Sequence, residues 1–253
     1  MGCHSRGSHP LRQSIKSGQK HMNRITLPVE TEIDYRLRWE TANIPQALYG
    51  VELGEWVPYN TRTDVAWNAV HDLVGELPER RKTPENPTRR QRSLVGVGVS
   101  LCGPPGTGKT QLAVSALTTA HRIHGASIHF LRAADYVSHA HKLLDLESDR
   151  DKREANPELY QSLLNERIRV GRVSLLVVDD LGQEYTGPRG YSQNLLTQLF
   201  RRRFHRARPT IITSNHPQTD WHRYELSLPS FAKQAFPEYI VAGIDFRAEA
   251  RAA

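Results

Sequence analysis

The stretch Gly103-Pro104-Pro105-Gly106-Thr107-Gly108-Lys109-Thr110 decides the fold of this 253-residue chain. It fits the pattern G-x-x-x-x-G-K-[ST] and lies between an apolar run at Val95–Cys102 and a helical pattern at Lys109–His124, which Gly125 can end. The glycines let the backbone wrap closely around phosphate groups, and the helix that follows presents its positive N-terminal end to the same anion. The stretch therefore predicts a phosphate-binding loop.

The residues of this loop have separate expected roles. We expect Lys109 to reach the β- and γ-phosphates of ATP, and the Thr110 hydroxyl to bind Mg²⁺. The alternative interpretation is a glycine-rich turn whose lysine faces solvent. The expected nucleotide-binding set is the loop with the residue after it: Gly103, Pro104, Pro105, Gly106, Thr107, Gly108, Lys109, Thr110 and Gln111.

Two acids follow a second apolar run, Val173–Val178. Carboxylates at the carboxyl end of a central parallel strand lie where open α/β sheets bind their ligands. We expect Asp179 to hold Mg²⁺ through water, and Asp180 to orient or deprotonate the attacking water. The alternative is an acid pair that leads a strand into a turn.

A third strand, Thr210–Ser214, ends in small polar residues. Asn215 follows it and could donate a hydrogen bond to the γ-phosphate or to the attacking water. Ser-Asn after a strand is also ordinary turn chemistry, so this assignment depends on the two motifs that precede it.

The alternation of strands and helices predicts the fold class. Strands at Val95–Cys102, Ser127–Leu131, Val173–Val178 and Thr210–Ser214 are separated by helical patterns, so crossover connections and a parallel sheet are expected. The predicted fold is α/β, with a central parallel sheet flanked by helices. The expected helices are Lys109–His124, Ala134–Leu146, Glu158–Val170 and Asn194–Arg206, with a charged stretch at Glu147–Glu154.

The N-terminal part is expected to differ from this core. Residues 1–21 hold four Lys or Arg and no acid, and we interpret them as a tag or a disordered leader. Residues 22–62 form a short extension, and residues 63–253 the ATPase core. Within the extension, Ile33, Tyr35, Leu37 and Trp39 fit either a strand or a helix. They are a possible partner-docking element, although packing against the core is the favoured alternative. Residues 64–75 predict a helix that Asp64 caps and Gly75 closes.

Composition sets outer limits on function. No apolar run approaches the ~18 residues of a membrane span, and no signal-peptide core is present. Two cysteines far apart, without metal-ligand spacing, fit a reducing cytoplasm. The net charge of +7 permits nucleic-acid binding without requiring it. Three segments are candidate DNA contacts: the Pro-rich charged stretch 76–93, expected to be a loop, the arginine run 201–206 and the loop 182–190 around Arg189. A solvated linker is the favoured alternative for the first, and cations that stabilise the C-terminal end of a helix are the alternative for the second.

These motifs together resemble the AAA+ P-loop NTPases of the DnaC-type helicase loader and IstB-type transposition helper family. The resemblance is carried by Gly103–Thr110, by Leu175–Gly182 reading Leu-Leu-Val-Val-Asp-Asp-Leu-Gly, and by Thr210–Asn215. Weaker similarity lies in Asn43-Ile44-Pro45, in Ile128-His129-Phe130 and in Arg203-Phe204. A closing segment, Gly243–Arg247, resembles the C-terminal strand of the family.

The resemblance implies a set of partners. Such proteins assemble as rings or spirals on ATP binding, bind single-stranded or duplex DNA, and hand it to a replicative helicase or a transposase. A neighbouring subunit would supply an arginine finger after the third motif. Here Lys233 falls near that position, and Arg223 is the other candidate. Because lysine lacks the planar fork of arginine, and because Asp180 stands where most AAA+ relatives have Glu, slow hydrolysis is expected.

Three functions remain open. The first is an ATPase that loads a replicative helicase in DNA replication, chromosomal or phage-encoded. The second is a transposition helper that selects target DNA and stimulates a transposase. The third is a nucleotide-gated adaptor with negligible turnover.

Overall fold

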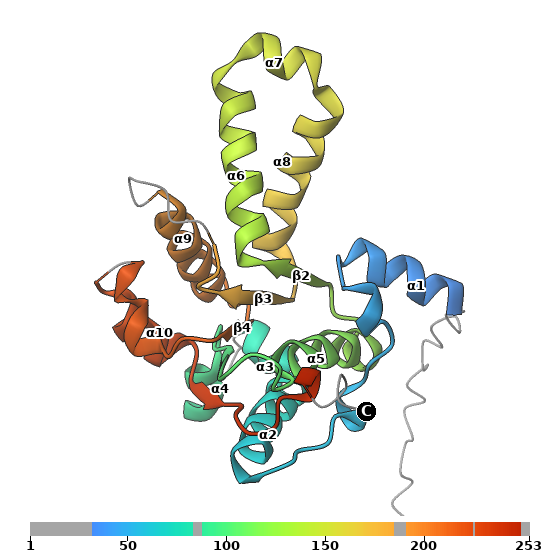
Figure 1. Ribbon diagram of the computed structural model, residues 1–253, viewed down its shortest axis with the longest axis vertical. Helices are drawn as coiled ribbons and strands as arrows, with labels where there is room; N and C mark the ends of the chain where they lie inside the picture. The colour runs from blue at the N-terminus through green and yellow to red at the C-terminus, as the bar shows by residue number, and fades with distance from the viewer. Residues whose placement is uncertain (1–31, 83–87, 185–190, 225, 249–253) are drawn as a thin grey trace, which may run out of the picture.

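A single parallel sheet organises the molecule. The structure is a computed structural model that describes residues 32–82, 88–184, 191–224 and 226–248. Its five strands lie in the order β2-β3-β4-β1-β5, and every neighbouring pair is parallel. The strands are β1 (Val99–Cys102), β2 (Ile128–Arg132), β3 (Leu175–Leu181), β4 (Thr210–Ser214) and β5 (Glu238–Ile240). Helices flank this sheet (Figure 1), which confirms the predicted α/β fold class.

The α-helices of the described residues fall before, between and after these strands. Those before β1 are α1 (Glu32–Thr41), α2 (Thr61–Gly75), α3 (Leu77–Arg81) and α4 (Arg89–Leu94). Those between strands are α5 (Lys109–His124), α6 (Ala133–Ser148), α7 (Arg150–Ala155), α8 (Pro157–Arg172) and α9 (Tyr191–His205). Near the C-terminal end, α10 spans Leu228–Ala235, and short 3-10 helices occur at η1 (Gln46–Leu48), η2 (Leu53–Glu55) and η3 (Gln218–Arg223).

Both faces of the sheet are covered, because alternate residues of each strand point to opposite sides. In β3, Leu175 and Val177 join a core that contains α2 and α5, whereas Leu176 and Val178 join one that contains α9 and α10. This explains why the strand sequences are continuously apolar instead of alternating. The result is a three-layer arrangement of helix, sheet and helix.

The segment before α2 packs on the first of these cores. Residues 33–39, which fitted a strand or a helix, lie in α1. Trp39 is buried and Leu37 is exposed. Beyond α1, the Phe130 backbone N–H donates to Ala42, and the Asn43 side chain donates to the Phe130 carbonyl, so this segment covers the free edge of β2.

Two long helices project beyond the sheet (Figure 1). They are α6 and α8, which lie side by side and are joined at the far end by α7, which overlaps the charged stretch 147–154. A small separate core of Leu143, Leu146 and Leu163 holds the pair together.

Several local expectations are wrong. The strand expected at Val95–Cys102 begins at Val99, and the one expected at Val173–Val178 spans Leu175–Leu181. The helix expected at 64–75 begins at Thr61, because Asn60 caps it by accepting a hydrogen bond from the Thr63 N–H. The stretch 76–93, expected to be a loop, contains α3 and α4; a capping box of Thr88 and Gln91 begins α4. The C-terminal strand is β5, and residues 243–247 lie beyond it in a bend and the start of a helical turn.

Candidate functional site

The phosphate loop connects the carboxyl end of β1 to the N-terminus of α5. Close packing explains its first glycine, because a Cβ at Gly103 would collide with the Val241 carbonyl oxygen. Gly108 caps α5 with a positive φ of 86°, a conformation that glycine adopts at low cost. The backbone N–H groups at the start of α5 have no partner within the helix, so they can donate hydrogen bonds to an anion.

Lys109 is held inside the loop that it serves. Its side chain is buried, and its Nζ donates hydrogen bonds to the carbonyl oxygens of Gly103 at 2.8 Å and Pro104 at 2.7 Å. Burial lowers the pKa of Lys109, and the nearby Asp180 and Asp179 carboxylates oppose that shift. The ammonium group is therefore kept at the phosphate loop, and not in solvent as the alternative interpretation required.

Thr110 and Asp179 meet, although 69 positions separate them in the chain. The Thr110 hydroxyl donates to Asp179 Oδ1 at 2.9 Å, and the Thr213 hydroxyl donates to the same oxygen at 2.6 Å. Asp179 is only 3% exposed. Burial raises the pKa of its carboxyl, the hydrogen bond from Thr213 lowers it, and the charge of Asp180 raises it again. A divalent cation would relieve this buried charge.

The donor set fits Mg²⁺. Within the described ranges, no group of three or more His, Cys, Asp or Glu side chains is placed to hold a metal ion by itself. Magnesium in nucleotide sites is held by one or two carboxylates together with substrate phosphates. The adjacent hydroxyl and carboxylate oxygens of Thr110 and Asp179 are hard ligands of this kind, beside the phosphate loop.

A β-bulge separates the two acids. Val178 pairs with Ile212 and Leu181 pairs with Ser214, so Asp179 and Asp180 together face Thr213 alone. Asp180 takes a positive φ of 54°, and its N–H donates to the Thr213 hydroxyl at 3.0 Å in place of a ladder bond. The bulge re-aims the chain at this point, as bulges beside active sites commonly do.

The other expected site residues lie at more varied places. Asn215 directly follows β4, and its Oδ1 atom is buried without a hydrogen bond from any described residue. Gln111 is exposed in the first turn of α5. Lys233 is exposed on α10, and Arg223 ends η3, but the Arg223 side chain lies outside the described residues. Loop residues 185–190, including Arg189, lie outside them as well.

Two segments beside the phosphate loop were not expected from the sequence. The Tyr59 hydroxyl donates to the Thr107 carbonyl at 3.0 Å, and Tyr59 packs edge-on against Phe246. The Phe246 N–H donates to the Gly106 carbonyl at 3.1 Å, and a Cβ at Gly106 would collide with the Asp245 carboxylate. The charge of Arg247 also contributes to the lowered pKa of Lys109. No sequence feature near Tyr59 predicts its contact with Thr107. The resemblance did mark Gly243–Arg247, but as a C-terminal strand.

These features define the class: the chain is a P-loop NTPase of the AAA+ type. A family model supplies the particular family. Residues 96–227, which are 132 of the 253 residues, match the model of the IstB-like ATP binding proteins, and the chain belongs to this family. No curated protein matches the sequence.

Solved structures of low sequence identity share the fold. The DnaC helicase loader is 20% identical, with a TM-score of 0.57 over 78% of this chain and 99% of that one. DnaI is 16% identical, with a TM-score of 0.56 over 83% and 100%. A putative primosome component from Streptococcus pyogenes serotype M3 is 19% identical, with a TM-score of 0.53 over 80% and 91%. In the described part of the chain, none of the helices has both the length and the apolar character needed to cross a membrane.

Proposed function

We propose that the chain binds MgATP at Gly103–Gln111 and hydrolyses it slowly, in assemblies that form on DNA, and that it acts in the cytoplasm as a replicative helicase loader. The observation that carries the proposal is the contact of Thr110 with Asp179 at the carboxyl edge of the sheet, directly behind the phosphate loop. Two residues that bind one metal–nucleotide complex must converge in this way.

The proposed roles follow from position. Lys109 neutralises phosphate charge, Thr110 and Asp179 hold Mg²⁺, and the bound cation offsets charge on the phosphate oxygens. Asp180 accepts the proton of the attacking water at its carboxylate. Asn215 orients that water, which donates to its unsatisfied Oδ1 atom, or donates from its amide N–H to the γ-phosphate.

Two cations could complete the site from a neighbouring copy of the chain. Lys233 is the first candidate and Arg223 the second, since each follows β4 in the sequence and belongs to a helix near the C-terminal end. An arginine finger contributes ~10³–10⁵ in rate. If a Lys233→Ala variant retains full ATP turnover, Lys233 is not the finger and Arg223 becomes the candidate.

The nucleotide test is direct. Purified protein should bind labelled ATP in magnesium buffer, and Lys109→Ala should abolish that binding. Asp179→Ala should keep binding but lose magnesium-dependent hydrolysis. If the unaltered protein does not bind ATP, or if Asp179→Ala turns over at the normal rate, the site has been assigned wrongly.

The partner requires its own test. The folds of a helicase loader and a primosome component support loading, whereas the matched IstB-like family supports the second candidate, a transposition helper. ATP-dependent retention of a purified replicative helicase on single-stranded DNA would support the first. Stimulation of a transposase on target DNA would support the second. Electron microscopy with DNA and a non-hydrolysable ATP analogue would show whether a ring or a spiral forms.

A third candidate, a nucleotide-gated adaptor, is favoured by Asp180 and Lys233 in place of the usual Glu and Arg. It predicts turnover near background with and without DNA, while Lys109→Ala still abolishes ATP-dependent assembly. In each case we propose residues 63–253 as the ATPase core and residues 22–62 as an extension that can dock a partner. Residues 1–21, expected to be a tag or leader, lie outside the described residues.

A further inference from the structure

The positive charge of the chain is concentrated in two segments. Residues 76–98 and 199–210 contain eleven Lys and Arg and three Glu, a net charge of +8. The whole chain carries +7, so the remaining residues together carry −1. The excess charge of this protein is therefore a local property, and its location matters more than its sum.

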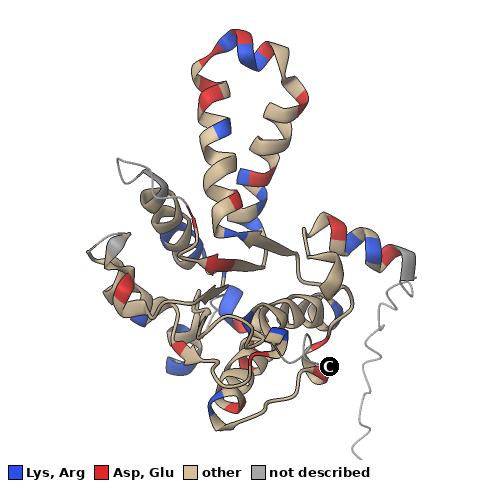
Figure 2. Ribbon diagram, viewed as in Figure 1, with Lys and Arg blue, Asp and Glu red and all other residues tan. Residues whose placement is uncertain are grey.

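Folding brings the two segments to one edge of the sheet. The first leads into β1 and the second into β4, and these strands are parallel neighbours that begin together, with Val99 opposite Ile211. The end of α9 also lies against the first segment, because a Cβ at Gly96 would collide with the Phe204 carbonyl oxygen. Figure 2 shows Lys and Arg on α3, α4 and α9, whereas α7 mixes both signs.

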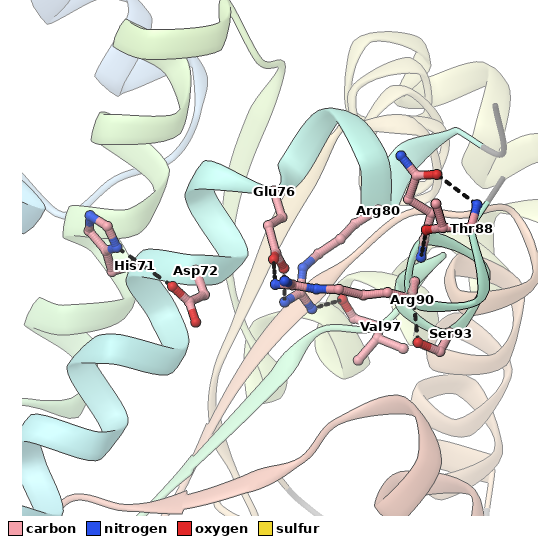
Figure 3. A network of polar contacts seen from close by, with 9 residues as sticks. His71, Asp72, Glu76, Arg80, Thr88, Arg90, Ser93 and Val97 are labelled. Carbon is pink, nitrogen blue, oxygen red and sulfur yellow. Dashed lines mark hydrogen bonds and ion pairs between the residues drawn. The ribbon is translucent and has the colours of Figure 1, made fainter.

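Two arginines of these segments are structural. Arg203 is fully buried and donates to Thr210 Oγ1 and to the carbonyl oxygens of Val170, Val173 and Pro209. Arg80 is buried, donates to the Val97 carbonyl, and forms an ion pair with Glu76 at 3.0 Å (Figure 3). These contacts hold the backbone of both segments in place, and the other cations project from that backbone.

The other cations of the two segments have little acid near them. Among the described residues of the two segments the acids are Glu76 and Glu79, and Glu76 is already shared by Arg80 and Arg90 (Figure 3). Arg81 and Arg208 form no ion pair with any described residue, and the Nε atom of Arg81 is buried without a hydrogen bond.

Arg81 and Arg208 are also close enough to repel each other. Burial and the charge of Arg208 lower the pKa of Arg81. Two like charges held together without a carboxylate between them cost free energy in the isolated protein. An anion placed against both would remove that cost.

We propose that this surface, the basic edge, binds the sugar-phosphate backbone of DNA. The basic edge consists of the cations Arg81, Lys82, Arg89, Arg92, Arg206 and Arg208. Guanidinium groups suit phosphate because they offer several donors in a fixed plane. The site is separate from the nucleotide site, since the basic edge lies at the amino end of β1 and the phosphate loop at its carboxyl end, about 13 Å away along four residues. The inference adds a location to the DNA binding in the proposed function.

The test compares paired charge removals. Arg81→Gln with Arg208→Gln, and separately the more exposed pair Arg92→Gln with Arg206→Gln, are measured against a control, Arg36→Gln with Lys142→Gln. The control removes two exposed cations from α1 and α6. Binding of labelled 30-mer DNA, single-stranded and duplex, is followed by anisotropy from 50 to 300 mM salt. ATP binding and thermal unfolding are measured on every variant.

Each basic-edge pair should weaken DNA binding, while the control should not. If both cations of a pair contact phosphates, the slope of log K against log salt should decrease in magnitude by about 1.8 on duplex or about 1.4 on single strands. ATP binding should stay unchanged in all variants. The two DNA forms show which one the edge prefers.

The proposal is overturned if neither pair changes affinity or slope more than the control does, or if the unaltered protein binds neither form of DNA. Because ATP binding is read separately, such a result leaves the nucleotide assignment standing. Loss of ATP binding by the unaltered protein would instead refute the proposed ATPase and leave the basic edge to be judged on DNA alone.

Discussion

Thr213 supports the candidate site through one hydroxyl, and the substitution Thr213→Val removes that group with little change of shape. The hydroxyl donates to Asp179 Oδ1 at 2.6 Å and accepts from the Asp180 N–H at 3.0 Å. Thr213 is fully buried, so water cannot replace either contact. Valine would leave one carboxylate oxygen with a single donor and one backbone N–H with none.

The expected cost follows from these two contacts. A hydrogen bond to a charged group contributes about 1.5–3 kcal/mol and a neutral one about 1 kcal/mol, so the loss should total about 2–4 kcal/mol. For a domain of this size that lowers the melting temperature by roughly 5–15 °C. Hydrolysis should also decrease, because Asp179 loses one of the two hydroxyls that orient it.

Thr197→Val is the matched control. Thr197 is buried on α9, and its hydroxyl has no hydrogen-bond partner among the described residues. The same chemical change there should be neutral or slightly stabilising. Differential scanning calorimetry of both variants in nucleotide-free buffer provides the comparison. If Thr213→Val melts within 1–2 °C of Thr197→Val, a difference of roughly 1 kcal/mol or less, the hydroxyl does not hold the acids as argued.

Three further variants test other parts of the reasoning. Asp179→Asn retains an oxygen that accepts from Thr110 and Thr213 but removes a buried charge. Because the pKa of Asp179 is raised, its ionisation destabilises the fold as the pH rises above about 4. The melting temperature of the variant, relative to that of the wild type, should therefore be higher at pH 7 than at pH 4. Magnesium-dependent hydrolysis should be lost. Arg203→Met leaves several buried acceptors without a donor, so it should lower the free energy of unfolding in urea by roughly 3–5 kcal/mol. Asn215→Ala removes an unsatisfied oxygen, so it should leave the melting temperature nearly unchanged while ATP turnover falls.

The sequence predicted best the elements with a strong local signal, such as an apolar run or a glycine at each end. The strand β4 has the expected bounds Thr210–Ser214, and α5 runs from Lys109 to His124 with Gly125 as its cap. In each case local preference and tertiary burial favour the same structure. The buried strands β1, β3 and β4 were each located from their apolar runs, although only β4 has the expected bounds.

Prediction failed where a contact distant in sequence decides the conformation. We predicted a loop at residues 76–93 because this stretch is rich in proline and in charged residues. Yet α3 forms there, held by the Arg80 side chain, which reaches the Val97 carbonyl and the Glu76 carboxylate. The strand β3 likewise continues past Val178 through both acids, because the Thr213 hydroxyl on the next strand replaces the missing ladder bond.

The candidate site also contains residues that the sequence predicts and residues that it does not. The placement of the phosphate loop after β1 and of Asp179 beside Thr110 could be predicted, because the expected chemistry requires particular residue types at fixed spacing. Tyr59 and Asp245 could not, because they reach the phosphate loop through packing of chain segments far from it. The strand β5 illustrates the cause: it places the C-terminal segment beside β1, and the Val241 N–H donates to the Cys102 carbonyl just before the loop begins.

Two departures from ordinary packing coincide at the carboxyl edge of the sheet. Asp180 has a left-handed backbone conformation, which costs a residue with a side chain about 1–2 kcal/mol, and Asn215 buries an oxygen without a donor. Neither feature helps the isolated chain to fold. Both lie at the ends of adjacent strands, beside Asp179, whose charge is also disfavoured by burial, and local strain of this kind gathers at functional sites. In the proposed function, a bound cation would offset the charge of Asp179 and the attacking water would donate to Asn215 Oδ1, so one complex would meet both needs.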